Sequence, residues 1–367
     1  MEERKVTWLE LFFDLVFVVA IASTNHLLLS IEQTNSLVTL FKYFLMVIPL
    51  WWAWTGQTMF YNRFHKYLKY PIIFMGIQIL AIIMMCASFN MNFEETYYTF
   101  MIGYGLSRFI TIIEYRFVYH RSTNNKVLQV SNTLSYCLLL GLLVTLSSLI
   151  FNNELRYIIM YMGIFLDLLL PLLFHQRMKL VIVHIAHLAE RLGLLVMITF
   201  GEAVVSIVSS LELHGFNHQQ LIITVLSLLS LLLLFLSYYD DYDEIINKKH
   251  VGSGQLLLYG HLFIIMAIMI MACLINIGTK FNNNLLFYLI GLSSLITFVL
   301  FKNIIFDYYD YQKKKINIIR ILSLIIIIIL CGSIGLLISS YYYSYWLIMV
   351  CLVSFIDNRL LKKSRQS

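Results

Sequence analysis

The chain has 367 residues, of which 60% are hydrophobic and 13% are charged, and its formal net charge is +6. Soluble globular domains carry about 25% charged residues, so the composition excludes a sizeable soluble domain. It indicates a single all-α membrane domain over residues 1–367, in which the positive charge lies in cytoplasmic loops and no nucleic acid is a partner.

Long apolar runs recur from one end of the chain to the other, as in a polytopic bundle of transmembrane helices. A helix needs about 20 apolar residues to cross a bilayer, and the runs predict about 12 spans. In chain order these are residues 8–29, 37–60, 70–90, 96–118, 130–151, 156–175, 186–210, 219–239, 255–276, 284–306, 316–338 and 341–359.

Basic residues alternate between the loops of this topology. The second loop carries Arg63, Lys66 and Lys69, whereas the third carries Glu94 and Glu95. Cytoplasmic loops are enriched in Lys and Arg. The alternation over the chain therefore predicts that both termini are cytoplasmic.

The first span contains two acids, Glu10 and Asp14, one helical turn apart. An ionisable group inside a membrane helix costs about 2.5 kcal/mol or more and usually marks function. We predict that Asp14 belongs to a proton or ion pathway. Glu10 is expected to be a counter-charge or structural partner, or to lie at the membrane interface.

The second span carries aromatic and polar side chains toward its end. Trp52 and Trp54 are followed by Asn62 and Arg63. These four residues are a possible substrate platform. The alternative for the tryptophans is packing and an interfacial aromatic belt.

The fourth and sixth spans each carry charge. Arg108 on the fourth is expected to be a counter-charge or a structural partner. Asp167 on the sixth is a further candidate for the ion pathway, and Pro171 lies four residues after it. Since that proline cannot donate to the Asp167 carbonyl, a kink is expected there.

The seventh span is the most charged of the apolar helices. At about 100° per residue, His187, Glu190, Arg191 and Glu202 share one third of its circumference. We assign His187 and Glu202 to the ion pathway, and Glu190 and Arg191 to a structural or interfacial pair. Gly201 precedes Glu202, so another helix or a water column could approach closely.

Three further features of the sequence bear on its chemistry. His184, His187 and Glu190 have metal-ligand spacing, but Arg191 would repel a cation, and no metal or cofactor is expected. The five cysteines lie in apolar runs without a CxxC pair. His261 on the ninth span is either a proton relay or an interhelical hydrogen-bonding residue.

The two halves of the chain contain a short similarity. FFDLVFVVAI and TFGEAVVSIV align when Asp14 is set against Glu202. The first and seventh spans have the same predicted orientation. A parallel pseudo-repeat of residues 1–180 and 181–367 is therefore possible.

Several segments together resemble one protein family. They are WLELFFDLVFVVAI at 8–21, WWAW with YNRF within 51–64, and HLAERLGLLVMITFGEAVVSI at 187–207. These motifs resemble the low temperature requirement protein A family of bacterial polytopic membrane proteins. The resemblance implies a multi-pass protein of the bacterial plasma membrane and no established biochemical activity.

The buried acids, histidines and arginines favour a proton- or cation-linked secondary transporter or an ion-conducting protein. Its partners would be the bilayer and a small ion or small-molecule substrate. One alternative is a membrane-embedded enzyme that acts on a lipid or isoprenoid substrate. Another is a structural or sensory protein whose polar groups only hold helices together. The sequence favours a non-enzymatic role and leaves the substrate and the oligomeric state open.

Overall fold

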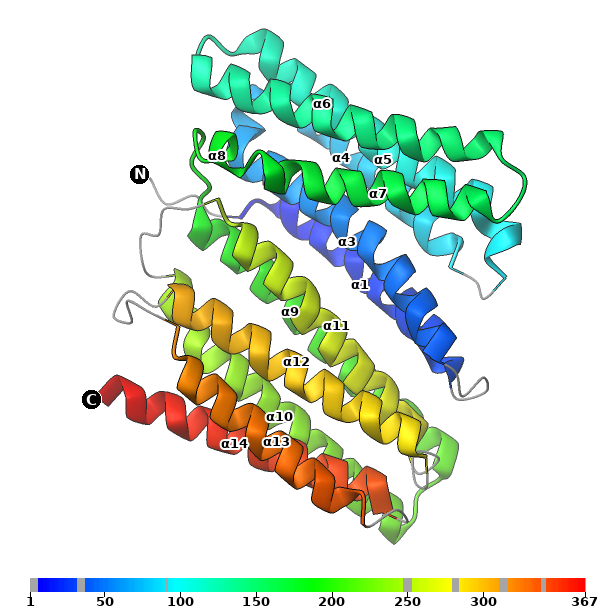
Figure 1. The fold of residues 1–367 in the computed structure, drawn as a ribbon, viewed down its shortest axis with the longest axis vertical. Helices are drawn as coiled ribbons and strands as arrows, with labels where there is room; N and C mark the ends of the chain where they lie inside the picture. The colour runs from blue at the N-terminus through cyan, green and yellow to red at the C-terminus, as the bar shows by residue number, and fades with distance from the viewer. Residues whose placement is uncertain are drawn as a thin grey trace. The chain divides into compact units, whose positions relative to one another are not determined.

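The computed structural model describes residues 6–31, 37–89, 92–246, 253–278, 284–309, 316–337 and 341–366. Within these ranges the chain forms helices and short connections, and no strand (Figure 1). The all-α prediction is confirmed. The long helices are α1 (Trp8–Leu29), α3 (Leu37–Phe64), α4 (Pro71–Ala87), α5 (Phe93–Arg121), α6 (Asn125–Ser147), α7 (Leu155–Leu173), α9 (Ile185–His214), α10 (His218–Ile246), α11 (Gln255–Ile277), α12 (Leu285–Tyr309), α13 (Ile318–Gly335) and α14 (Tyr342–Gln366).

In the described ranges, three short helices occur at the ends of long ones. The 3₁₀ helices η1 (His65–Tyr67) and η2 (Ser148–Ile150) follow α3 and α6, and α8 (His175–Met178) follows α7. Each of the predicted spans overlaps one long helix.

Nine helices among the described residues are long and apolar enough to cross a membrane. They are α1, α3, α6, α7 and α9–α13, so the chain is a multi-span helical membrane protein. Helix α4 is shorter, at 17 residues, and α5 and α14 carry more charge. The count of 12 spans and the cytoplasmic termini stay predictions. Several of the loop charges on which these two predictions rest lie outside the described residues: Arg4, Lys5, Glu32, Lys248, Lys249, Lys280, Lys313, Lys314 and Lys315.

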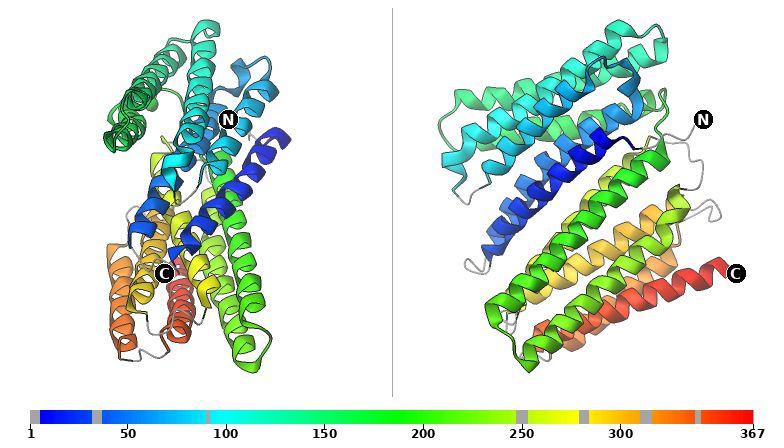
Figure 2. Two further views of the ribbon diagram at one scale, coloured as in Figure 1. Left: turned by 90° about the vertical axis from the view of Figure 1, so that its right-hand side faces the viewer. Right: turned by 180° about the vertical axis from the view of Figure 1, so that it is seen from behind.

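The chain divides into two compact units. Unit 1 comprises Met1–Leu27, Leu40–Arg191 and Val251–Gln255, and unit 2 comprises Leu28–Thr39, Leu192–His250 and Leu256–Ser367. In unit 1, the consecutive helices α4, α5, α6 and α7 pack each against the next (Figure 1). In unit 2, α10 lies beside α14, and α12 and α13 also pack against α14 (Figure 2). The single membrane domain and the pseudo-repeat stay predictions.

Glycines let α6 and α7 approach closely. A Cβ atom on Gly163 would lie 2.5 Å from the backbone nitrogen of Thr145, and one on Gly141 would lie 3.0 Å from the carbonyl oxygen of Gly163. Small residues at such contacts are typical of membrane helices, where close backbone packing replaces the hydrophobic effect. The close approach brings the Asp167 side chain of α7 against α6.

Candidate functional site

A buried polar cluster joins α1, α3 and the start of α9 within unit 1. We call it the Arg191 cluster, and each member is at most 2% exposed. Its members are Glu10, Asp14, Trp54, Asn62, His187 and Arg191.

Arg191 and Asp14 form a two-pronged ion pair at the centre of the cluster. The Nε atom of Arg191 donates to Oδ2 of Asp14 over 2.9 Å, and its Nη2 donates to Oδ1 over 2.5 Å. Trp54 donates from Nε1 to the same Oδ1 over 2.8 Å, and the guanidinium carbon lies 5.5 Å from the Trp54 ring centre. Charge-assisted, bidentate pairs of this kind are among the stronger hydrogen bonds, so the Asp14 carboxylate is held by three donors.

Glu10 links the first turn of α1 to the start of α9. Its Oε2 accepts the backbone N–H of Thr7, and the Thr7 hydroxyl oxygen accepts the backbone N–H of Glu10. This reciprocal pattern is a capping box, which satisfies donors left open at a helix start. The other oxygen, Oε1, lies 3.3 Å from Nε2 of His187 and 3.7 Å from Nη1 of Arg191.

Asn62 fixes the start of α9 and the tautomer of His187. Its Oδ1 accepts the His184 N–H over 2.9 Å, and its Nδ2 donates to the His184 carbonyl over 3.0 Å. Nδ2 also lies 3.1 Å from Nδ1 of His187, which must then accept. The ring proton of neutral His187 is therefore on Nε2, the atom that faces Glu10.

A second buried cluster of unit 1 lies between α3, α5 and α7. We call it the Arg108 cluster, and its side chains are fully buried. Its members are Gly56 and Gln57 of α3, Tyr104, Arg108 and Glu114 of α5, and Asp167 of α7.

Arg108 is held loosely in comparison with Arg191. Its Nε lies 3.9 Å from Oδ2 of Asp167, and its guanidinium carbon lies 5.1 Å from the centre of the Tyr104 ring. Nε, Nη1 and Nη2 have no hydrogen-bond partner in the described part of the chain. Tyr104 donates its hydroxyl to Oδ2 of Asp167 over 2.6 Å. The acid is therefore bound mainly by the tyrosine.

Glu114 is a buried acid for which the described part of the chain supplies no ion-pair partner. Gln57 donates from Nε2 to its Oε1 over 2.9 Å. Among the described residues its Oε2 has no hydrogen-bond partner, and neither has the Oε1 atom of Gln57. Buried polar atoms are nearly always hydrogen-bonded, so this pair and Arg108 form the least satisfied polar region described in unit 1.

A third buried cluster, the Lys302 cluster, lies in unit 2. Lys302 forms an ion pair with Asp357 and donates to Oγ of Ser237 over 2.8 Å. Arg320 donates to Oδ1 of Asp307 over 2.8 Å. Asn303 joins the two pairs: its Nδ2 lies 3.3 Å from Oδ1 of Asp357, and its Oδ1 accepts from Arg320 over 2.7 Å. Two acids thus face two cations.

The remaining predicted residues lie in varied surroundings. His261, in unit 2, donates from Nδ1 to the Leu257 carbonyl over 2.7 Å, so its Nε2 accepts from the Tyr238 hydroxyl over 2.8 Å. The bond to Tyr238 joins α11 to α10, so His261 makes the interhelical hydrogen bond that was predicted from the sequence as the alternative to a proton relay. Glu190 is half-buried, and Glu202, in unit 2, is half-buried beside an exposed Gly201.

The four residues of the predicted substrate platform lie in different surroundings. Trp52 is buried. Trp54 and Asn62 belong to the Arg191 cluster, as described. Arg63 is half-buried and donates to the Ser253 carbonyl over 3.4 Å. The structure thus joins Asp14, Glu10, His187 and Arg191 in one cluster, and Arg108 and Asp167 in another.

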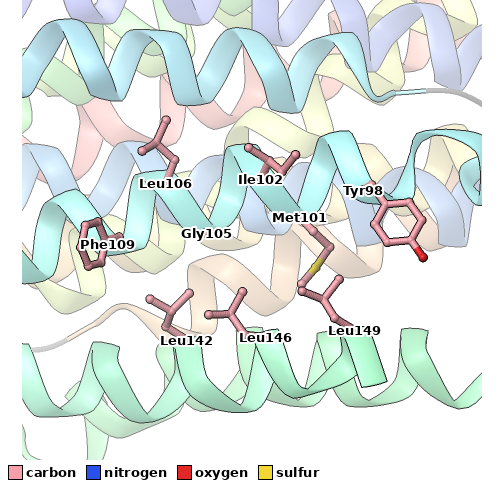
Figure 3. Close-up of a pocket in the computed structure, with 9 residues that line it drawn as sticks. All are labelled: Tyr98, Met101, Ile102, Gly105, Leu106, Phe109, Leu142, Leu146 and Leu149. Carbon is pink, nitrogen blue, oxygen red and sulfur yellow. The ribbon is translucent and has the colours of Figure 1, made fainter. Parts of the chain in front are cut away.

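An open groove of about 400 Å³ runs between α5 and the end of α6. Leu142, Leu146 and Leu149 point toward Met101 and Phe109 across it (Figure 3). Its lining is almost wholly apolar, so it offers no group that could hold a charged solute. The groove is therefore suited to contact with lipid chains, and it is separate from the polar clusters.

Sequence reasoning did not assign roles to Glu114, Gln57 and Tyr104, or to the Lys302 cluster. Charge inside an apolar run was the available signal for Glu114, Lys302 and Asp357. Gln57 and Tyr104 carry no comparable signal, because neutral polar residues are common in membrane helices.

Comparison with protein families places the chain in a known group. Residues 5–355 match the family model described as bacterial low temperature requirement A protein (LtrA), which confirms the resemblance over nearly the whole chain. Neither the curated proteins nor the solved structures yielded a match.

Proposed function

This chain belongs to the bacterial low temperature requirement A family, and we propose that it is a transport protein of the bacterial plasma membrane. Protons or cations would move by way of buried carboxyl groups in unit 1. Asp167 and Glu114 are the carboxyl groups to which we assign this movement. A substrate-linked transporter and an ion-conducting protein share this requirement.

The observation that carries the proposal is the incomplete bonding of these two acids. Oδ1 of Asp167 and Oε2 of Glu114 are buried and lack hydrogen-bond partners among the described residues. A buried carboxyl group in this condition can change its protonation state at lower cost than one held by three donors. Ionisable groups at membrane depth commonly form proton relays.

The Arg191 and Lys302 clusters support different roles. Asp14 is bound by Arg191 and Trp54, and Asp357 is bound by Lys302 and Ser237. Both acids are matched by cations, as expected for groups that hold helices together. The ion-pathway roles of Asp14, His187, Glu202 and His261 stay predictions.

The test is proton movement into liposomes that contain the purified protein and a pH-sensitive dye. With an imposed potential and pH gradient, wild type should acidify the interior faster than empty liposomes. Asp167→Asn and Glu114→Gln should each lower the rate at least tenfold. Glu154→Gln is the matched control, because Glu154 is an exposed acid at the start of α7.

Two outcomes would contradict the proposal. One is a wild-type rate equal to that of empty liposomes. The other is an unchanged rate in both buried-acid variants when their unfolding temperatures show that they are folded.

A further inference from the structure

We propose that the Arg108 guanidinium binds a small monocarboxylate, and that a proton on Asp167 strengthens this binding. The inference rests on the proposed function, because it names the solute that would move with the proton. The Arg108 cluster would then hold both the solute and the coupled proton.

The first support is the contrast between Arg108 and the other buried arginines. Arg191 donates two hydrogen bonds to Asp14, and Arg320 donates to Asn303 and Asp307. Arg108 is fully buried, yet none of its three nitrogens has a hydrogen-bond partner in the described part of the chain. A buried guanidinium with open donors is suited to an anionic ligand.

The second support is the placement of the guanidinium fork. Nε is the atom near Asp167, at 3.9 Å from Oδ2. Nη1 is directed to Gly56 of α3, where an added Cβ would lie 3.0 Å from it. The missing Cβ of Gly56 thus lets the guanidinium lie close to α3, and the Tyr104 ring supports the guanidinium through a cation–π contact.

The third support is the charge around the site. Arg108 and Tyr104 of α5 contact Asp167 directly, and Cys137 of α6 interacts with it electrostatically. Near Arg108, α3 contributes the uncharged Gly56 and Gln57, and Gln57 binds Glu114. With Asp167 ionised, Arg108 is neutralised by its neighbour. With Asp167 protonated, the positive charge of Arg108 is available, so anion and proton favour each other.

The ligand class follows from the same geometry. A planar guanidinium matches the two oxygens of a planar carboxylate through parallel hydrogen bonds. A single cation balances one negative charge, so a monocarboxylate fits better than a doubly charged phosphate.

The experiment measures the unfolding temperature of the full-length protein in detergent at constant ionic strength. The probes are the sodium salts of formate, acetate, lactate and pyruvate, with chloride and inorganic phosphate for comparison. At least one carboxylate should raise the unfolding temperature of wild type, with a dissociation constant at least tenfold lower at pH 5.5 than at pH 8.

Three variants assign the effect. Arg108→Gln should abolish the response. Asp167→Asn should keep it and remove its dependence on pH. Gly56→Ala should weaken binding about tenfold by placing a methyl group against Nη1, whereas Gly76→Ala is a control because a Cβ there contacts nothing within 4 Å. Gly56→Ala and Asp167→Asn keep the test decisive even where Arg108→Gln does not fold.

The inference is overturned when no carboxylate shifts wild type, when phosphate alone does so, or when Gly56→Ala and Gly76→Ala respond alike. Binding in detergent requires no transport. A carboxylate response with no proton movement in liposomes therefore contradicts the proposed function and leaves the inference standing. Proton movement in liposomes without a carboxylate response in detergent contradicts the inference and leaves the proposed function standing.

Discussion

Nε of Arg108 lies 3.9 Å from Oδ2 of Asp167, the same oxygen that accepts the Tyr104 hydroxyl over 2.6 Å. A cation and a neutral donor therefore share one carboxylate oxygen. The ion pair is longer than that of Arg191 with Asp14, whose hydrogen bonds measure 2.9 and 2.5 Å. The described residues of unit 1 thus include a tight arginine–aspartate pair and a loose one.

The tight pair should behave as a structural element. Arg191→Gln leaves Asp14 buried without its cation and should destabilise the protein by about 3–5 kcal/mol. Replacing both residues, as in Asp14→Leu with Arg191→Met, should restore much of that loss. Thermal unfolding in detergent measures each step, and Glu190→Gln is the control because the neighbouring Glu190 is only half-buried. A double variant as unstable as Arg191→Gln would contradict the prediction.

The Lys302 cluster should be separable from transport. Lys302→Met removes the cation that binds Asp357 and should cost about 3–5 kcal/mol. Lys302→Met combined with Asp357→Leu should recover stability and move protons in liposomes at a wild-type rate. A folded double variant that has lost proton movement would show that unit 2 takes part directly.

Gly141 should be intolerant of any side chain. A Cβ there would lie 2.0 Å from Oδ1 of Asp167, so Gly141→Ala must displace the carboxylate or separate α6 from α7. The cost should be about 1–3 kcal/mol, as for other overpacked sites. Gly76→Ala, on the exposed face of α4, should instead gain up to about 1 kcal/mol, because alanine favours a helix interior. Unfolding temperatures of the two variants compare these effects, and equal values would refute the close contact.

Asn62 should control the protonation pattern of His187. Asn62→Ala removes the bonds to the His184 backbone and to Nδ1 of His187. It should cost about 1–3 kcal/mol for the buried groups left unpaired. Nitrogen-15 NMR of labelled histidine should show the proton on Nε2 in wild type and a mixture of tautomers in the variant. A wild-type signal from the Nδ1–H form would contradict the assignment.

The helices themselves could be predicted because apolar length is a local property. The predicted span at 186–210 corresponds to α9, Ile185–His214, and that at 255–276 corresponds to α11, Gln255–Ile277. The charged residues of α1 and α9 could likewise be identified, since charge in an apolar run is conspicuous. The extent of unit 1 and the contacts between its helices could not be predicted from such local properties, because they depend on residues far apart in the sequence.

The pairing of charges is a property of the tertiary structure. Asp14 and Arg191 are 177 positions apart, and no helical periodicity connects them. The sequence predicts Trp54 as a substrate-platform residue or a packing residue. It does not indicate which acceptor the indole N–H would bind. Lys302 and Asp357 lie near the ends of their predicted spans, where charges commonly reach the interface. Their mutual burial depends on how α12 and α14 pack.

Glu10 has a consequence for how the N-terminal end of α1 opens. Helix ends normally fray, and their amides exchange with solvent through small local fluctuations. Here one carboxylate caps α1 through Thr7 and also faces His187 and Arg191 at the start of α9. Unwinding the first turn of α1 therefore disturbs a buried ion pair. The amide of Glu10 should exchange hydrogen for deuterium as slowly as the helix interior, which makes this terminus a cooperative part of the unit.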